Sequence, residues 1–338
     1  MAERREAGTA TVQPRLEHPQ AAEGWRHRHV LDLDDFTPEE IRLVLDTADA
    51  MKEVLARDVP RVPTLRGCTV ATLFYEASTR TRASFELAAK VLGADVINVS
   101  ASGSSVEKGE SLVDTVRTLQ AIGVDALVMR HGMSGAPYLA AAHAACAVVN
   151  AGDGWHAHPT QALLDLYTMR SRLGDLRGRK VVIVGDITHS RVARSGLWGL
   201  TALGAEVVVV GPPTLLPAGL GRPNPEQEAG LPPVRVETDL DRALPGADVV
   251  MALRLQLERQ QGGYLPSLRE YARRYQVNAE RLALARPGAL VMHPGPMNEG
   301  VEIAPDVAHG LQSVVEEQVA NGVAVRMAVL YLLLRGTA

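Results

Sequence analysis

Short apolar strands alternate with helical segments along almost the whole chain, and this alternation restricts the fold more than any other feature. In the first half, strands are predicted within 64–75, 95–100, 125–130 and 148–154. In the second half the runs are more uniformly apolar, at 180–186, 205–211, 234–238, 247–253 and 289–295. Strands that alternate with helices at a spacing of about 30 residues are typical of βαβ units in a parallel sheet. Uniformly apolar strands suit a sheet that helices cover on both faces.

The chain divides into two halves, as a length of 338 residues also favours. A helix over Asp35–Lys52 precedes the first half, with Thr37 as a plausible N-cap residue. The strand pattern restarts after Gly174, and an amphipathic helix over Thr160–Leu173 joins the halves. One more helix, Gln312–Leu334, ends the chain. We therefore predict an α/β protein with two parallel-sheet domains joined by two helices.

Composition excludes several classes of protein. The formal net charge of −4 gives no electrostatic reason for binding nucleic acid, and the apolar runs are too short to span a bilayer. Cys68 and Cys146 are expected to be buried free thiols, which fits a reducing cytoplasm. Residues 1–25 carry charges of both signs and little apolar surface, so they read as a disordered extension and not a secretory signal. The stretch Pro212–Pro233 is rich in Pro and Gly and predicts a surface loop.

Polar residues follow several of the predicted strands, at the edge where parallel sheets bind ligands. The string Ser78-Thr79-Arg80-Thr81-Arg82 follows a strand and opens a helix. Its hydroxyls and guanidinium groups join the unpaired N–H groups of a helix start, which suits a phosphate dianion. A capped helix with two solvated arginines is the structural alternative, but this string has more donors than a cap requires.

Arginines follow three other strands, at Arg130, Arg191 and Arg254. A solvated arginine is individually the usual case, yet three at the same edge favour an anionic ligand. His158 and Gln161 begin the joining helix, where a solvated histidine is an equally good interpretation of those residues alone. His156 and His158 have no third ligand at a metal-like spacing, so we expect no metal. The turn after 180–184 lacks the G-x-G-x-x-G pattern of dinucleotide-binding enzymes, and we expect no cofactor.

Together these strings resemble the aspartate/ornithine carbamoyltransferases, and within them the aspartate branch. STRTR, SSVEKGESLVDT, MRH, HPTQALLDLYTM, VGDITHSR, LRLQLER and MHPGP occur in the family's order between about 29 and 335. The resemblance implies a carbamoyl phosphate-binding domain at 29–160 and an aspartate-binding domain at 161–310. It also implies a C-terminal helix at 311–338 that packs back on the first domain, and it leaves 1–28 as the extension.

The expected reaction joins carbamoyl phosphate to L-aspartate, giving N-carbamoyl-L-aspartate and phosphate in pyrimidine biosynthesis. By resemblance, the catalytic residues are Arg80, Thr81, His158 and Lys108. Carbamoyl phosphate is expected to be held by Ser78, Thr79, Arg80, Thr81, Arg130, His158, Gln161, Ser104, Pro294, Gly295 and Pro296. The aspartate ligands implied are Lys108, Arg191, Arg254 and Gln256. No covalent intermediate is needed, because the amine attacks the carbamoyl carbon directly through a tetrahedral intermediate.

In the family, Ser104 and Lys108 reach into the active site of a neighbouring subunit, so the resemblance implies a homotrimer with shared sites. The sequence leaves open whether regulatory chains or another pyrimidine-pathway enzyme join that trimer. An ornithine-specific relative usually carries D-x-x-x-S-M and H-C-L-P, where this chain has LRLQLER and HPGP. A scaffold paralogue is disfavoured because Arg80, His158 and Lys108 are all present.

Two further features could modify the site. Glu299 stands where bacterial relatives commonly carry arginine, so local ion pairing and substrate affinity are expected to differ there. The segment Leu257–Arg269, with Gly262 and Gly263, is the segment that we expect to move when the domains close on substrate.

Overall fold

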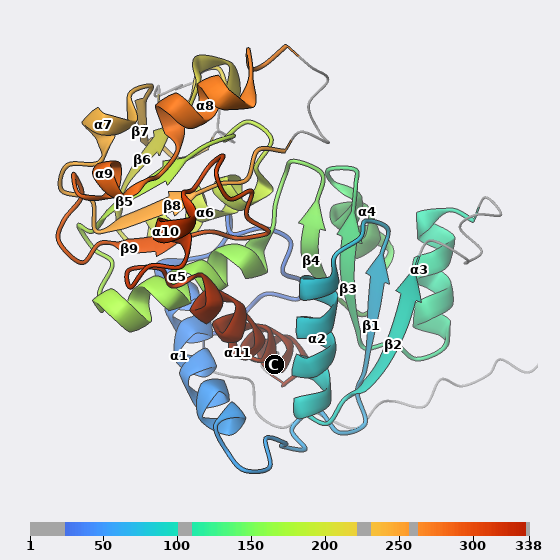
Figure 1. The fold of residues 1–338 in the computed structure, drawn as a ribbon. Helices are drawn as coiled ribbons and strands as arrows, with labels where there is room; N and C mark the ends of the chain where they lie inside the picture. The colour runs from blue at the N-terminus through green and yellow to red at the C-terminus, as the bar shows by residue number, and fades with distance from the viewer. Residues whose placement is uncertain (1–23, 101–109, 222–230, 257–262, 336–338) are drawn as a thin grey trace, which may run out of the picture.

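The computed structural model describes residues 24–100, 110–221, 231–256 and 263–335, which form two parallel sheets with helices around them (Figure 1). The first sheet has the strand order β2-β1-β3-β4, and every neighbouring pair is parallel. Its strands are β1 (Thr69–Phe74), β2 (Asp95–Ser100), β3 (Ala126–His131) and β4 (Ala147–Asp153). Its helices are α2 (Thr79–Val91), α3 (Leu112–Ala121) and α4 (Ala136–His143).

The second sheet has the order β7-β6-β5-β8-β9 and is also parallel throughout. Its strands are β5 (Lys180–Val184), β6 (Glu206–Val210), β7 (Arg235–Glu237), β8 (Val249–Ala252) and β9 (Leu290–Met292). Its helices are α6 (Arg191–Ala202), α7 (Leu240–Ala243), α8 (Leu268–Tyr275), α9 (Ala279–Leu282) and α10 (Pro305–Ala308). Nearly every residue of β5, β6, β8 and β9 is buried, as strands covered on both faces must be.

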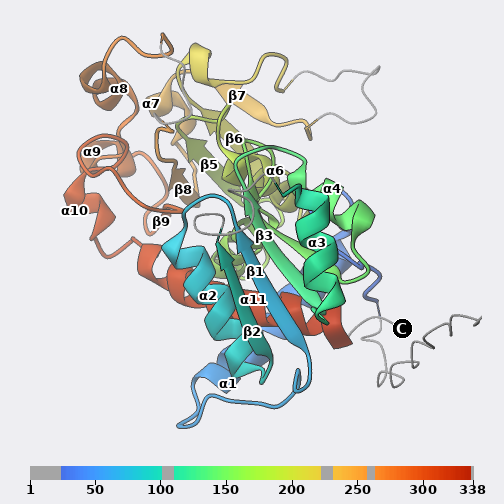
Figure 2. The ribbon, with the colours of Figure 1, turned by 90° about the vertical axis from the view of Figure 1, so that its right-hand side faces the viewer.

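Three helices lie beside one another where the halves meet: α1 (Pro38–Leu55), α5 (Pro159–Leu173) and α11 (Val315–Arg335). α11 packs on α1, α5 and also on α2 of the first half (Figures 1 and 2). α11 is long and apolar enough to span a membrane, but 67% of its most apolar window is buried inside the protein. Its apolar surface is therefore explained by packing, and α5 and α11 are the two helices that connect the halves.

Local sequence explains where the first helix begins. The Thr37 side chain accepts from the Glu40 backbone N–H, and Glu40 in turn accepts from the Thr37 N–H at 2.8 Å. This capping box, with Pro38 at the first helical position, is what the sequence predicts. The helix continues to Leu55, one turn beyond the predicted end.

Two predicted helix boundaries are wrong, because strand pairing takes the residues concerned. The Ala-rich sequence PYLAAAHAACAV also predicts a helix over 137–148, but the helix ends at His143, and Ala147 of β4 already pairs with Ala126 of β3. The last helix begins at Val315 and not at Gln312, because the backbone at 312–314 bonds to Val291 of β9 on both sides.

The last residues of the predicted N-terminal extension are folded. Residues 1–23 lie outside the described residues, but Trp25 and His27 are buried, and His27 stacks on Phe36 with ring centroids 4.0 Å apart. Residues 24–28 therefore belong to the folded protein. Neither cysteine forms a disulfide bond, and both are buried, as predicted. Within the predicted loop Pro212–Pro233, residues 213–215 form a short 3-10 helix and 222–230 lie outside the described residues.

Candidate active site

A cavity of about 530 Å³ lies between the two halves, at the carboxyl ends of strands from both sheets. Every predicted site residue that the structure describes lines it: Ser78, Thr79, Arg80, Thr81, Arg130, His158, Gln161, Arg191, Arg254, Gln256, Pro294, Gly295 and Pro296. The remaining two, Ser104 and Lys108, lie outside the described residues. Residues distant in sequence therefore meet in one cavity, which is the arrangement that a site between two α/β domains requires.

The first wall of the cavity is the start of α2. Ser78 is the N-cap residue, yet its side chain makes no capping hydrogen bond. The helix start therefore offers backbone N–H groups and a positive dipole end, with the Ser78 and Thr79 hydroxyls beside them. Arg82, the last residue of the string, does not line the cavity; its guanidinium lies 5.2 Å from the centre of the Phe74 ring. The string Ser78 to Arg82 thus contributes one arginine to the cavity lining, Arg80.

Arg80 and Arg254 come from opposite halves and face the same cavity. Burial lowers the pKa of the Arg80 guanidinium, and the charge of Arg254 lowers it further. Two like charges brought together raise the free energy of the empty site, so a bound anion would relieve their repulsion. Arg254 follows β8, and its Nη2 lies 3.3 Å from Oε1 of Gln256. The pair therefore forms one polar unit on the second half.

The loop at 293–296 fits closely around Arg80. Gly295 has φ +62°, and a Cβ at that position would overlap the Arg80 guanidinium. His293 is almost fully buried; its Nδ1 accepts from the Gly295 N–H at 2.7 Å, and its Nε2 lies 3.2 Å from Glu302. His293 therefore holds the loop in place, so that the backbone of Pro294 and Gly295 borders the cavity beside Arg80.

A single carboxylate joins the arginines of the two halves. Oε2 of Glu76 lies 3.0 Å from Nε of Arg130 and 2.7 Å from Nη2 of Arg191. Arg130 is the second-last residue of β3 in the first half, whereas Arg191 begins α6 in the second. Glu76 was not predicted, although its place between a strand and the STRTR string is a signal that could have identified it.

The end of β4 and the residue that follows it support both of these guanidinium groups. Nη1 of Arg130 donates to the Ala151 carbonyl at 3.3 Å, and Nη1 of Arg191 donates to the Gly154 carbonyl at 3.4 Å. Gly152 has φ +114°, and a Cβ there would lie 2.8 Å from Nε of Arg191. A side chain at this position would therefore displace Arg191.

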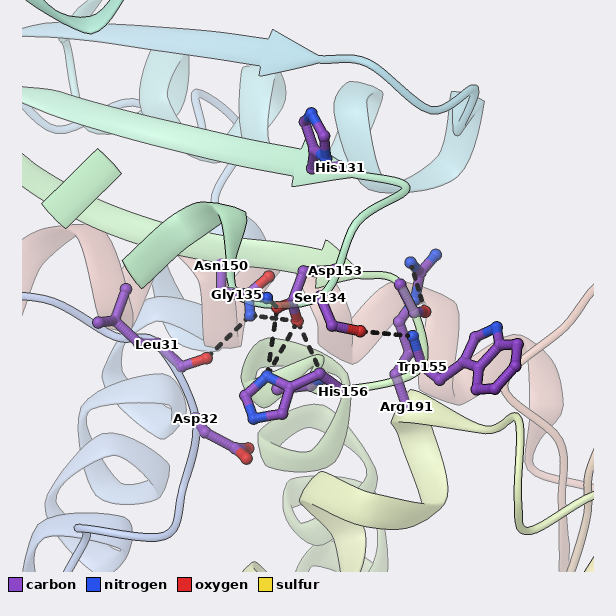
Figure 3. A network of polar contacts seen from close by, with 12 residues as sticks. Leu31, Asp32, His131, Ser134, Gly135, Asn150, Asp153, Trp155, His156 and Arg191 are labelled. Carbon is purple, nitrogen blue, oxygen red and sulfur yellow. Dashed lines mark hydrogen bonds and ion pairs between the residues drawn. The ribbon is translucent and has the colours of Figure 1, made fainter. Parts of the chain in front are cut away.

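Asp153, the last residue of β4, holds this end of the strand in place through a network of hydrogen bonds (Figure 3). Its buried carboxylate accepts from the side chain of Asn150 at 2.9 Å and from the backbone N–H groups of Ala157 and Gly135 at 2.9 and 2.7 Å. Burial alone would raise the pKa of Asp153, but hydrogen bonds from His156, Asn150 and Gly135 hold it below its usual value. Asp153 thus remains an anion and acts as a structural anchor behind the arginines.

His158 and Gln161 lie at the start of α5, and both are largely buried. The His158 backbone N–H donates to Ser195 Oγ at 3.0 Å, and Ser195 donates to Asp32 at 2.6 Å. Gln161 Nε2 donates to Asp165 Oδ1 at 3.0 Å. The sequence signal for Asp165 is its spacing of four residues, which places it on the same face of α5 as Gln161.

Three lining residues from elsewhere were also missed: Ser84 on α2, and Gln318 and Arg326 on α11. A charged residue inside an apolar helix is the signal that could have identified Arg326, which is buried and donates to Ser84 Oγ at 2.9 Å. Glu299 does not line the cavity; it pairs on the surface with His309 at 3.1 Å. Half of the predicted mobile segment, 257–262, lies outside the described residues.

The chemistry of the cavity follows from its charges. Its described lining includes the arginines at 80, 130, 191, 254 and 326, together with one acidic residue, Glu76. Such a site suits ligands with several negative charges. Because both halves contribute arginines, it can bind two anionic groups, carried either by one ligand or by two separate ligands. Backbone N–H groups, hydroxyls and a histidine at one end can also stabilise negative charge that develops on an oxygen.

Comparison with known proteins agrees with this chemistry. The family model "Aspartate/ornithine carbamoyltransferase, carbamoyl-P binding domain" matches residues 28–171, and "Aspartate/ornithine carbamoyltransferase, Asp/Orn binding domain" matches 177–333. The aspartate carbamoyltransferase catalytic subunit of Roseiflexus sp. (strain RS-1) is 63% identical over 308 residues, which are 91% of this chain and 95% of that protein.

Solved structures match over nearly the whole length. Aspartate transcarbamoylase from Trypanosoma cruzi in complex with carbamoyl phosphate has a TM-score of 0.82 at 32% identity, covering 94% of this chain and 100% of that one. Ornithine carbamoyltransferase from Pyrococcus furiosus has a TM-score of 0.81, also at 32% identity, covering 92% of this chain and 98% of that one. The fold alone therefore does not distinguish an enzyme that acts on aspartate from one that acts on ornithine. On the matches to both of its domains, the chain belongs to the aspartate/ornithine carbamoyltransferase family.

Proposed function

We propose that this chain is an aspartate carbamoyltransferase, which transfers the carbamoyl group of carbamoyl phosphate to the amine of L-aspartate. The observation that carries the proposal is the cavity in which Arg80 of the first half faces Arg254 and Arg191 of the second. The name of the relative that is 63% identical supports aspartate over ornithine. A cationic Arg254 supports the same choice, because it would repel the side-chain ammonium of ornithine.

Carbamoyl phosphate binds at the start of α2. Its phosphate group is held by Ser78, Thr79, Arg80 and Thr81, with Arg130 beside them. The carbamoyl oxygen lies among Arg80, Thr81 and His158, while Gln161 and the loop Pro294, Gly295 and Pro296 hold the carbamoyl NH2. The burial of Thr81 and His158, with Arg80 beside them in one cavity, supports this assignment.

L-Aspartate binds on the second half. Arg191 pairs with its α-carboxylate, and Arg254 together with Gln256 pairs with its side-chain carboxylate. Guanidinium groups bind carboxylates through two parallel hydrogen bonds, so two separated arginines measure the length of a diacid. The unit formed by Arg254 and Gln256 supports this role, because the Gln256 carbonyl can orient the guanidinium.

The amine of aspartate attacks the carbamoyl carbon, and negative charge grows on the carbamoyl oxygen in a tetrahedral intermediate. Each donor already placed at such an oxygen typically contributes ~3 kcal/mol to the stability of the transition state. Collapse of the intermediate breaks the bond to the phosphate oxygen, and the departing phosphate accepts the amine proton. A chemical step independent of pH through the second ionisation of phosphate would count against that proton acceptor.

The active unit is a homotrimer in which Ser104 and Lys108 complete the site of a neighbouring subunit, and the protein acts in the cytoplasm. Mixing inactive Arg80→Ala protein with inactive Lys108→Ala protein tests the shared site. Hybrid trimers then contain some sites with both residues intact, so activity should return. Mixtures that exchange subunits but stay inactive would contradict the shared site.

The function itself is tested by supplying carbamoyl phosphate with L-aspartate or with L-ornithine and measuring the product formed. Turnover with aspartate alone is expected. Turnover with ornithine alone would show that the roles given to Arg254 and Gln256 are wrong, while the carbamoyl phosphate half would stand. No turnover with either amine would refute the proposed function.

A further inference from the structure

A chain of buried hydrogen bonds runs behind the cavity wall and ends at Gln161. It begins at the backbone N–H of His293, which donates to Gln318 Oε1 at 3.0 Å. Gln318 Nε2 then donates to Asp165 Oδ1 at 2.7 Å, and Gln161 Nε2 donates to the same oxygen at 3.0 Å. This series of hydrogen bonds thus connects the loop after β9, helix α11 and helix α5.

The polarity of this chain is fixed at its first member. A side-chain amide has a donor end and an acceptor end that can exchange places, whereas a backbone N–H can only donate. The His293 N–H therefore requires the oxygen of Gln318, which turns the Gln318 NH2 toward Asp165. Asp165 accepts, and this in turn requires the NH2 of Gln161. The carbonyl Oε1 of Gln161 is the amide atom that this arrangement leaves for a ligand.

We propose that Asp165 is a positioning residue, which fixes the Gln161 amide so that its Oε1 accepts a hydrogen bond from the NH2 of the carbamoyl group. Gln161 lines the cavity, whereas Asp165 is nearly fully buried behind it. This inference rests on the proposed function, since it assigns the carbamoyl NH2 to Gln161. The inference adds a role for Asp165. By fixing the Gln161 amide, Asp165 lets the enzyme distinguish an amide group from a group of the same shape that has no N–H donors.

The charge around Asp165 does not alter this orientation. Burial raises the pKa of Asp165 to about 7, against hydrogen bonds from Gln318 and Gln161 and the charge of Arg326, which lower it. Protonation would place a hydrogen on one carboxyl oxygen and leave the other able to accept. Oδ1 therefore accepts from both glutamines in either form.

The consequence is a preference that can be measured by binding alone. Phosphonoacetamide carries the amide of the carbamoyl group, and acetonylphosphonate carries a methyl group in place of its NH2. A buried acceptor that loses its donor costs free energy, so the wild type should bind the amide about tenfold more tightly. Inorganic phosphate, which lacks the acyl group, serves as the reference ligand for the start of α2.

Asp165→Leu removes the acceptor while keeping a similar shape, and frees the Gln161 amide to turn over. The preference for the amide should then fall to about threefold or less, with phosphate affinity within about twofold of the wild type. Asp165→Asn keeps an oxygen in place of Oδ1, so it should retain most of the preference. Isothermal titration of the three ligands with each protein measures all of these values.

A double-mutant cycle tests whether Asp165 acts through Gln161. Gln161→Leu should lower the preference as far as Asp165→Leu does, and the double variant should lower it no further. A full wild-type preference in Asp165→Leu would overturn the inference. So would an equal loss of affinity for all three ligands, because that is the result of a general structural role.

If Asp165→Leu does not give the circular dichroism spectrum of the folded protein, Asp165→Ala removes the same acceptor with a smaller side chain. The preference should again fall, and an unchanged ratio would overturn the inference. Carbamoylation of aspartate by the wild type is measured alongside. Its absence would refute the proposed function, whereas the binding preferences would still decide the orientation of Gln161.

Discussion

Oε2 of Glu76 lies 2.7 Å from Nη2 of Arg191, across the boundary between the two halves. The same oxygen lies 3.0 Å from Nε of Arg130. One carboxylate therefore determines where the guanidinium groups proposed for phosphate and for aspartate stand relative to each other. Because this pair spans the two halves, its geometry is sensitive to how they approach.

Glu76→Gln should weaken aspartate binding more than carbamoyl phosphate binding. Both guanidinium groups would keep a backbone carbonyl, but Arg191 would lose the shorter contact with Glu76, at 2.7 Å against 3.0 Å for Arg130. We expect kcat/KM for aspartate to fall about tenfold, which corresponds to roughly 1.4 kcal/mol. Steady-state kinetics with each substrate varied in turn would measure this, and equal losses for both substrates would contradict it.

Gly152→Ala should impair catalysis beyond its effect on stability. The new Cβ would lie 2.8 Å from Nε of Arg191 and 3.3 Å from Nη1 of Arg130, at a backbone φ of +114°. Strain of this kind typically costs about 1–2 kcal/mol, and displacement of Arg191 is expected to lower kcat/KM about a hundredfold.

Gly246→Ala is the matched control, because that residue has φ +78° with nothing within 4 Å of its added Cβ. It should lose stability in a thermal melt but retain wild-type kinetics. Similar kinetics for the two glycine variants would show that the space beside Arg191 is not required.

Arg254→Met should raise KM for aspartate about a hundredfold, because a charge-assisted pair of hydrogen bonds to the side-chain carboxylate would be lost. Removing the nearby cation should also let the pKa of Arg80 rise, since Arg254 now lowers it. Arg242→Met, on an exposed side chain of α7, is the control and should match the wild type. Unchanged aspartate KM in Arg254→Met would exclude its proposed role.

Asp32 should make stability depend on pH between about 4 and 6. Burial raises its pKa to about 6 in the folded protein, although the hydrogen bond from Ser195 opposes the shift. Because the folded state holds its proton more tightly, the contribution of Asp32 is present below the unfolded pKa and is lost as pH rises through the folded value.

Asp32→Asn removes this titration while keeping an oxygen for Ser195. Relative to the wild type, the variant should gain stability as pH rises from 4 to 7, on the order of 3 kcal/mol at most. Urea unfolding at several pH values would measure the difference. Parallel stability curves for the two proteins would contradict the prediction.

The sequence predicted the parts of the site that rely on local pattern. Ser78 to Thr81 and Arg130 follow strands of the first sheet, and the edge rule alone brings them together. His158 and Gln161 required the resemblance, because a histidine at a helix start is equally often solvated. Glu299 was expected to alter the site, but the turn after 296 carries it to the surface beside His309.

What the sequence could not predict depends on packing between distant segments. Gln318 meets Asp165 only because α11 lies along α5, although the two residues are 153 positions apart. The predicted start of α11 was wrong for the same reason. Residues 312–314 pair with Val291, and this pairing depends on the edge of a sheet formed earlier in the chain. Periodicity reports the buried face of a helix but not which partner covers it.

The chain passes between its halves at α5 and again before α11, and these two helices lie side by side. Two adjacent connections restrict relative movement more strongly than one connection does, because twisting or sliding would have to break the packing between them. Rotation about an axis along the helix pair disturbs this packing least. We therefore expect opening and closing to follow that one rotation, with any ligand that contacts both walls favouring one angle of it.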